Sequence, residues 1–244
     1  MWKTRWTSIV AQIQIVLTIE DHQAVLRRLT NAEKPTVLAF VNAHAMNSCA
    51  TDPAFSDALA SADILLRDGS GMSMLYRQIG RDPGRNMNGT DFIPELLTAF
   101  RGKRVAFWGT QDPFLAQAAL VAEREFGVRV VSLANGFMAH DNYLVLAKET
   151  YPDLIVLGMG MPKQEQLARL LREKGGGAPL IACGGAVLDF LGGKVKRAPH
   201  ILRVLGIEWL YRFLREPRRL FMRYMVGNPV FMLRVRAWKR QVTS

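Results

Sequence analysis

Short apolar runs alternate with amphipathic helical patterns along most of the chain, and this alternation constrains the fold more than any other feature. Six of these runs predict strands: TVLAFVN, DILLRD, RVAFWG, VRVVSL, DLIVLG and PLIACG. Strands separated by helices favour a parallel sheet, so we expect an α/β fold, a Rossmann-like and mostly parallel sheet with helices on both faces. The N-terminal MWKTRWTSIVAQIQIVLTIED predicts a leading strand, because it lacks the cleavage site of a signal peptide.

Each predicted strand ends in glycine, asparagine or aspartate. Turn chemistry accounts for any one of these residues. The whole set also suits a binding site, because ligands of parallel sheets bind outside the carboxyl ends of the strands and glycines let backbone amides approach a phosphate. The residues at these ends are Asn42, Asp68, Gly109, Thr110, Asn135, Gly136, Gly158, Gly160, Gly184 and Gly185.

Two helix starts carry acids that suit catalysis or binding. Asp68, in RDGSG, is placed to act as a general base, and Asp91 follows Asn88 and Thr90 in NGTD. On spacing alone, a helix cap is the more frequent role for either acid. Both interpretations stay open at this point.

A glycine-rich turn leads into a helix at Gly158–Gln166, GMGMPKQEQ. The helix opens with Pro162 and carries Gln164 and Glu165 in its first turn, where a phosphate or sugar can bind the helix N-terminus. The turn is not a dinucleotide fingerprint, because the third glycine and the later ribose-binding acid are missing. Further on, Asp189 lies in an apolar helix between two Gly-Gly pairs, either paired with an arginine or part of a pocket.

Several site classes are absent from the sequence. There is no Asp-x-Asp for a metal-bound diphosphate, no Walker A, no Gly-x-Ser-x-Gly and no Cys/His pair. Cys49, Cys183 and the four histidines show no ligand spacing, so we expect no metal and no cofactor, and two structural thiols in a reducing cytoplasm.

The net charge of +11 lies entirely in the last fifth of the chain. From Lys194 onward there are 13 Lys/Arg and two acids, whereas residues 1–193 carry 19 of each sign. A neutral body with a basic tail predicts a polyanionic partner, either nucleic acid or an anionic membrane surface. Large aliphatic side chains between the arginines favour the membrane.

The strand and helix alternation stops at Ala198, which predicts a catalytic α/β domain at 1–197 and a membrane-associating helical appendage at 198–244. GIEWLYRFLREP predicts an amphipathic helix, and Pro217 ends it or starts the next. GNP predicts a further break, with Asn228 as a cap, Pro229 at the first position and a last helix over 230–240.

Four segments together resemble the WecG/TagA/CpsF glycosyltransferases, also called glycosyltransferase family 26. They are DGSG, NGTD, GMGMPKQE and GGAVLDFLGGKVKRAP with the following GIEWLYRFLREPRRLFMRY. The resemblance implies inverting, metal-independent transfer of a sugar from a UDP-linked donor to a polyprenyl-diphosphate-linked sugar, for exopolysaccharide, teichoic acid or common-antigen synthesis. It also implies a peripheral protein at the cytoplasmic face of the inner membrane.

The resemblance also implies roles for single residues. Asp68 aligns with the proposed base and Gln164 with a glutamine implicated at the active site. The expected substrate-binding residues are Asn42, Asn88, Gly89, Thr90, Asp91, Gly109, Thr110, Gly136, Gly158, Gly160, Pro162, Glu165, Asp189, Arg212, Arg215, Arg219 and Arg223.

The chain departs from the family pattern at two positions. Phe40 stands where the family often has threonine, two residues before Asn42. Asn86 stands where the family usually has arginine, and Arg85 is displaced by one residue. Both positions fall where donor and acceptor would be recognised, so they affect sugar identity more than reaction type.

The expected partners are a UDP-sugar donor, a lipid-diphosphate-linked acceptor and an anionic inner-membrane surface, with a homo-oligomer left open and no nucleic acid. Two other functions are weighed against transfer. A nucleic-acid-binding protein would use the basic tail and its aromatics, and a nucleotide-binding oxidoreductase would need the fingerprint that is missing.

Overall fold

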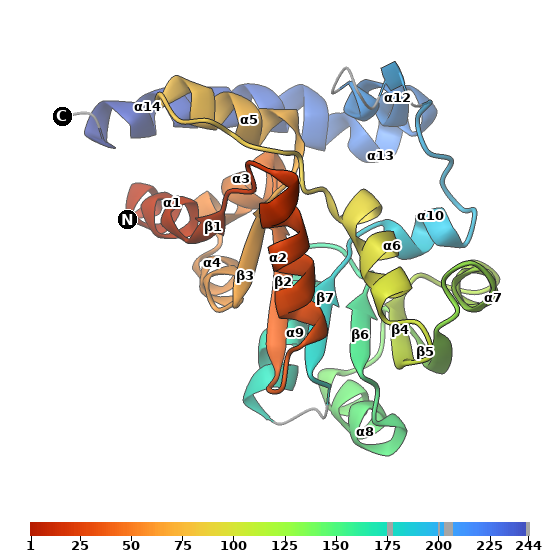
Figure 1. The fold of residues 1–244 in the computed structure, drawn as a ribbon. Coiled ribbons are helices and arrows are strands. Elements are labelled where there is room, and N and C mark those ends of the chain that lie inside the picture. The colour runs from red at the N-terminus through yellow and green to blue at the C-terminus, as the bar shows by residue number, and fades with distance from the viewer. Residues whose placement is uncertain (175–177, 200, 203–206, 243–244) are drawn as a thin grey trace.

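A parallel sheet forms the centre of the molecule. The computed structural model describes residues 1–174, 178–199, 201–202 and 207–242. In this part of the chain seven strands pair in the order β1-β3-β2-β7-β6-β4-β5, all parallel. The predicted α/β fold is thus confirmed (Figure 1). The strands are β1 (Ile13–Gln14), β2 (Thr36–Val41), β3 (Ile64–Arg67), β4 (Arg104–Gly109), β5 (Arg129–Asn135), β6 (Leu154–Leu157) and β7 (Leu180–Cys183).

Helices cover both faces of the sheet, with one apolar core on each side. Successive side chains of a strand point to opposite faces, so Val37, Ala39 and Val41 enter one core while Leu38 and Phe40 enter the other. The helices of this α/β part are α2 (Ile19–Thr30), α3 (Ala43–Thr51), α4 (Pro53–Ala60), α5 (Gly69–Gln78), α6 (Gly89–Ala99), α7 (Phe114–Phe126), α8 (His140–Thr150), α9 (Lys163–Glu173) and α10 (Val187–Leu191).

The N-terminal prediction is wrong. Residues Trp2–Gln12 form a helix, α1, and only the two residues of β1 pair with β3. Trp6, Ile9 and Val10 are spaced by three and four residues, so a helix puts them on one buried face. The Trp6 indole donates to the backbone oxygen of Met46, 2.7 Å away, which ties this face to α3.

The C-terminal segment forms α12 (Glu208–Arg215), α13 (Pro217–Phe221), a π-helical turn (Met222–Val226) and α14 (Gly227–Val242). The break predicted at GNP is wrong, because the helix runs through Asn228 and Pro229. Pro229 is the third residue of α14, in the first turn, where the missing N–H of proline is tolerated. A π turn lies directly before this helix, and the Gly227 N–H donates to the Met222 oxygen five residues back.

Helix α14 packs into the same core as α1 and α3, alongside α5 (Figure 1). Phe231, Val235 and Trp238 are buried. The Trp6 ring centroid lies 5.6 Å from that of Phe231 and 6.1 Å from that of Trp238, and the Trp238 indole donates to the Thr7 hydroxyl at 3.0 Å. The two ends of the chain therefore stabilise each other.

Truncating Trp238 tests this contact. We expect Trp238→Ala to lower the free energy of unfolding by about 3–5 kcal/mol, because a buried indole is replaced by a cavity. The matched control is Leu233→Ala on the same helix, where the side chain is 63% exposed, with an expected change of at most about 0.5 kcal/mol. Urea unfolding of both variants measures the difference, and equal midpoints would contradict this packing role for α14.

Candidate active site

Asp68 and Asn42 meet at the carboxyl ends of two neighbouring strands. Val41 of β2 is in register with Arg67 of β3, so the next residue of each strand lies at the same edge. The Asn42 side chain donates from Nδ2 to Asp68 Oδ2 at 3.1 Å, and its Oδ1 accepts from the Ala45 N–H at the start of α3. One amide thus caps a helix and positions the carboxylate.

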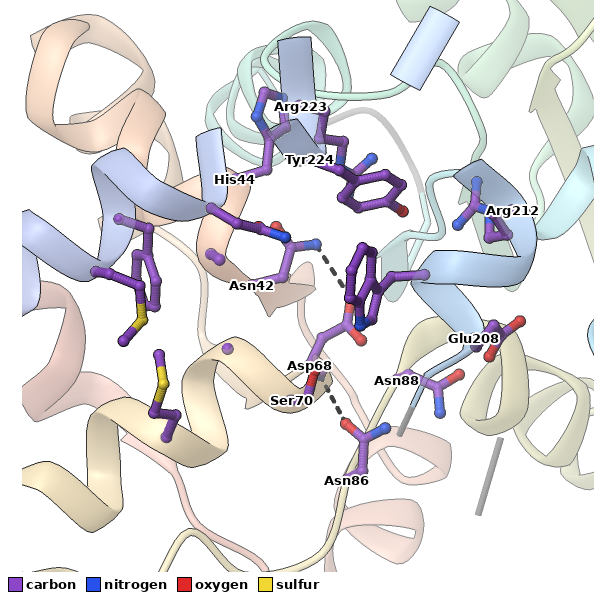
Figure 2. A pocket seen from close by; sticks show the side chains of 18 of the residues that line it. Asn42, His44, Asp68, Ser70, Asn86, Asn88, Glu208, Arg212, Arg223 and Tyr224 are labelled. Carbon is purple, nitrogen blue, oxygen red and sulfur yellow. Dashed lines mark hydrogen bonds between the residues drawn. The ribbon is translucent and has the colours of Figure 1, made fainter. Parts of the chain in front are cut away.

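The Asp68 side chain is not used as a helix cap. It occupies the residue before α5, yet its carboxylate accepts no capping hydrogen bond. Gly69 has φ +85°, which favours glycine, and its N–H donates instead to Asn86 Oδ1 at 2.7 Å. The cap interpretation is therefore wrong for Asp68, and the carboxylate faces the cavity (Figure 2).

Arg67, the last residue of β3, fixes the end of the strand just before Asp68, and its side chain is 2% exposed. Its guanidinium donates to the Pro83 and Gly84 oxygens at 2.7 and 3.1 Å and to the Ser73 hydroxyl at 2.7 Å. These bonds join the loop before Asn86 to the start of α5. The turn around Asp68 is therefore fixed on both sides.

A cavity of about 540 Å³ opens above Asp68 between the α/β part and the C-terminal helices. Figure 2 shows Arg212 and Arg223 entering it from the C-terminal segments. The Arg212 Nε is buried without a hydrogen-bond partner among the described atoms. The lining residues used below are Asn42, His44, Asp68, Asn86, Asn88, Thr90, Glu208, Trp209, Arg212, Arg223 and Tyr224.

Burial and nearby charges act in opposite directions on Asp68. Burial raises the pKa of its carboxyl group, and the Asn42 hydrogen bond and the positive charges of Arg223 and Arg212 partly offset this increase. Burial and Arg223 also lower the pKa of His44 to about 4. His44 is therefore neutral near pH 7, and the net positive charge that faces Asp68 comes from the arginines.

The described residues contain no group of three or more His, Cys, Asp or Glu side chains placed to hold a metal ion. Among the residues that the structure describes, no helix is both long enough and apolar enough to cross a membrane.

Comparison with known proteins identifies the family. The sequence profile described as "Glycosyl transferase WecG/TagA/CpsF family" matches residues 10–244. The chain belongs to this family. One relative, from Bacillus spizizenii, is 30% identical over 75% of the chain and 72% of its own length. Another, from Staphylococcus aureus strain MW2, is 26% identical over 96% of each chain. Both are named N-acetylglucosaminyldiphosphoundecaprenol N-acetyl-beta-D-mannosaminyltransferase.

The structure separates the four arginines expected from the family resemblance. Arg212 and Arg223 line the cavity. Arg215 lies over the Tyr211 ring, 5.5 Å from its centroid, and Arg219 pairs with Glu216. The latter two do not line the cavity.

Gln164 lies outside the cavity and joins two strand-end loops. It is 1% exposed, and its Oε1 accepts from the Gly160 N–H at 3.2 Å and the Gly185 N–H at 3.0 Å. Its Nε2 donates to Glu165 Oε1 at 2.8 Å. In this arrangement Gln164 holds the ends of β6 and β7 together, and the catalytic role expected for it stays a prediction. Pro162 is the residue before α9.

The glycines after β4, β5 and β6 are packed against one another. A Cβ on Gly109 would lie 2.6 Å from the Gly158 carbonyl carbon, and one on Gly136 would lie 2.8 Å from the Gly109 oxygen. These contacts require glycine for close backbone approach. Gly160 differs, with φ +79° and open space where a Cβ would be. A second cavity, about 420 Å³, opens at the ends of β4 and β5.

A second polar cluster lies beside the end of β4. Lys194 Nζ is 3.2 Å from Asp189 Oδ1 and 3.3 Å from the Thr110 hydroxyl. The partner of Asp189 is thus a lysine, where an arginine or a pocket was expected. The cluster does not line the larger cavity.

The start of α6 joins the larger cavity through Asn88 and Thr90. Asn88 caps the helix, because its Oδ1 accepts from the Asp91 N–H at 3.0 Å. The cap alternative for Asp91 is therefore wrong. A Cβ on Gly89 would lie 3.2 Å from the ring of Phe40, so this glycine lets the ring pack under the helix start.

Several cavity residues were not expected from the sequence as binding residues. Asn86, noted only as a departure from the family pattern, accepts a hydrogen bond from the Gly69 N–H, and His44 lies three residues after the end of β2. Glu208, Trp209 and Tyr224 reach the cavity from the C-terminal helices. The position of His44 after β2 was the one available signal. The positions of Glu208, Trp209 and Tyr224 depend on how α12 and the π turn pack.

Glu165 gives the fold a testable pH dependence. Burial raises its pKa to about 7 from an ordinary value of 4.5. Between these values the native chain holds a proton that the unfolded chain has lost, so stability falls as pH rises through this window. Above it the cost reaches about 3 kcal/mol. We expect Glu165→Gln to stabilise the protein by about this amount near pH 8 and little near pH 5, by urea unfolding.

The matched control for Glu165→Gln is Glu149→Gln, because Glu149 is exposed on α8. It should leave the difference in stability between the two pH values unchanged. Destabilisation by Glu165→Gln near pH 8 would contradict an uncompensated buried carboxylate.

Proposed function

We propose that the chain is an inverting glycosyltransferase that moves a sugar from a UDP-linked donor to a polyprenyl-diphosphate-linked sugar at the cytoplasmic face of the membrane. The observation that carries the proposal is the position of Asp68. Its side chain does not cap a helix, and it faces a cavity that Arg212 and Arg223 also line. Family membership gives the reaction class, and the names of the two relatives supply an N-acetylmannosaminyl donor group and a lipid-diphosphate acceptor.

Asp68 is the general base of the proposed step. Its carboxylate takes the proton from an acceptor hydroxyl as that oxygen forms a bond to the anomeric carbon of the donor. The bond from this carbon to the diphosphate oxygen breaks, and UDP leaves with the electron pair. A single displacement inverts the anomeric centre. Burial raises the pKa of Asp68 and makes it a stronger base than an exposed carboxylate.

The positive charge for the departing diphosphate comes from Arg212 and Arg223. A guanidinium can bind two oxygens of a phosphate at once, and both side chains already lie at the cavity. Charge held in place before the reaction stabilises the transition state without reorganisation. Transfer is therefore proposed to need no divalent cation.

Replacing Asp68 by asparagine tests the base. We expect Asp68→Asn to lower the transfer rate by about 10²–10⁴-fold, because the amide cannot accept the proton. The assay uses a panel of UDP-sugars, a short-chain lipid-diphosphate-linked N-acetylglucosamine and EDTA. Circular dichroism checks that the fold is kept.

The control is Asp57→Asn, on the exposed surface of α4, which should transfer at the wild-type rate. Full activity of Asp68→Asn would remove Asp68 as the base. No transfer by the wild-type chain with any donor would contradict the proposed function.

We also propose that the C-terminal helices bind an anionic membrane surface. Leu214, Met222 and Leu233 are 71, 68 and 63% exposed, and exposed arginines such as Arg218 lie between them. Apolar side chains enter the interface and each arginine near anionic lipid adds about 1 kcal/mol. This location would bring the cavity to a lipid-linked acceptor.

Vesicle flotation tests the membrane surface. The double variant Leu214→Glu/Met222→Glu should float at least about tenfold less with phosphatidylglycerol vesicles, because two charges replace apolar side chains that would enter the membrane interface. Leu120→Glu is the control, since Leu120 is 61% exposed on α7. Equal flotation of both variants would contradict the assignment, and a salt-resistant shift of DNA would favour the nucleic-acid alternative.

A further inference from the structure

Arg197 joins three elements next to the larger cavity. Its Nη1 donates to Asp91 Oδ1 at 2.6 Å and contacts the Thr90 oxygen at 3.4 Å, both at the start of α6. Its Nη2 lies 3.8 Å from Glu208 Oε2 at the start of α12. The side chain is 27% exposed, so these charges interact with limited screening.

The third element is α10, through the ring of Phe190. The Arg197 guanidinium carbon lies 5.6 Å from the ring centroid and that of Arg212 lies 5.4 Å from it. One aromatic ring therefore contacts the residue that joins α6 to α12 and a cavity arginine on α12. Cation–π contacts of this kind are worth more where water is excluded.

Asp91 links Arg197 to the other wall of the cavity. Its Oδ1 accepts from Arg197, while its Oδ2 accepts from the Asn88 side chain at 2.7 Å. Asn88 lines the cavity and Asp91 does not. Asp91, which was expected to bind substrate, thus orients the Asn88 side-chain amide and binds the Arg197 guanidinium.

We propose that Arg197 is a positioning residue that sets α12 against α6, so that Arg212 and Asn88 keep their places in the cavity that Asp68 faces. The inference rests on the proposed transfer reaction, in which Arg212 and Asp68 contact substrate. Losing the Arg197 contacts lets α12 shift, and a displacement of about 1 Å at a reacting group costs up to about 10²-fold in rate. Helix α14 is anchored separately, because the Trp238 indole donates to the Thr7 hydroxyl, so we expect the sheet and α14 to keep their packing when Arg197 is replaced.

The test compares Arg197→Gln, Arg197→Lys and the control Arg28→Gln, whose exposed side chain lies on α2. We expect Arg197→Gln to lower kcat by about 10- to 100-fold with a small change in donor KM. Arg197→Lys should recover part of the rate, because it keeps the charge beside Asp91 but cannot also reach Glu208 and the Phe190 ring. Arg28→Gln should match the wild type.

Hydrogen exchange gives a readout that does not need activity. Backbone amides of Glu208–Arg215 should exchange faster in Arg197→Gln, while those of β2 and β7 and the thermal midpoint stay as in the wild type. A double variant with Asp91→Asn should transfer no more than about threefold more slowly than Arg197→Gln alone, because the Arg197–Asp91 contact is lost in both and asparagine can still accept the Asn88 hydrogen bond.

Two outcomes overturn the inference. One is that, in Arg197→Gln, the backbone amides of α12 exchange hydrogen at the wild-type rate and the transfer rate is unchanged. The other is a loss of rate accompanied by faster exchange throughout the sheet, which indicates general destabilisation. If the wild-type chain transfers no sugar, the proposed function fails, and the exchange of α12 still decides whether Arg197 holds this helix.

Discussion

The packing of α14 on α3 and α5 shapes the cavity, because all three helices contribute residues to its lining. A Cβ on Gly71 would lie 3.0 Å from Ala43 Cβ, so glycine lets α5 approach α3 closely, and the Phe231 ring of α14 lies in ordinary contact beside the same glycine. Helix α14 continues from the π turn that carries Arg223. The packing of α14 beside DGSG therefore helps to place Arg223 near Asp68, the aspartate that opens the same motif. The motif is thus a packing surface as well as a turn.

The electrostatics of the cavity change once a substrate diphosphate enters it. In the free protein burial raises the pKa of Asp68, and the positive charges of Arg223 and Arg212 lower it in part. A bound diphosphate would neutralise these arginines and add negative charge, which raises the pKa of a nearby carboxyl group. In the proposed reaction, substrate binding itself would make Asp68 a stronger base. The base would then be most effective only when the donor is in place.

The positions of the central strands were largely predictable, because burial on both faces gives apolar runs that no solvent-exposed helix would carry. The first segment was not, because Ile9, Val10 and Ile13 fit a helical spacing while the neighbouring residues fit a strand. Their environment decides: Trp6 contacts Met46 of α3 and the rings of Phe231 and Trp238 on α14, elements distant in sequence. The π turn directly before α14 is likewise a feature that no local pattern indicates.

For the candidate site, strand-end chemistry put both Asn42 and Asp68 among the expected residues, since parallel strands end at one edge of the sheet. Their direct contact follows from the pairing of β2 with β3. The positions of Asn86 and His44 could not be derived in the same way. The Gly69 N–H donates to Asn86, and Arg67 binds the Pro83 oxygen in the loop that leads to Asn86. In the sequence this buried cation is simply the last residue of an apolar strand. Buried polar groups of this kind are specified by tertiary hydrogen bonds, which sequence periodicity does not encode.

The glycines at the strand ends look alike in sequence but divide into two physical classes. Gly69, Gly160 and Gly185 have positive φ and open space where a Cβ would be, whereas Gly109 and Gly158 are in backbone contact with each other. All three amides of the first class are already bonded to side chains: the Gly69 N–H donates to Asn86, and those of Gly160 and Gly185 donate to Gln164. In this chain the cations that enter the cavity are therefore better placed than backbone amides to bind a diphosphate there.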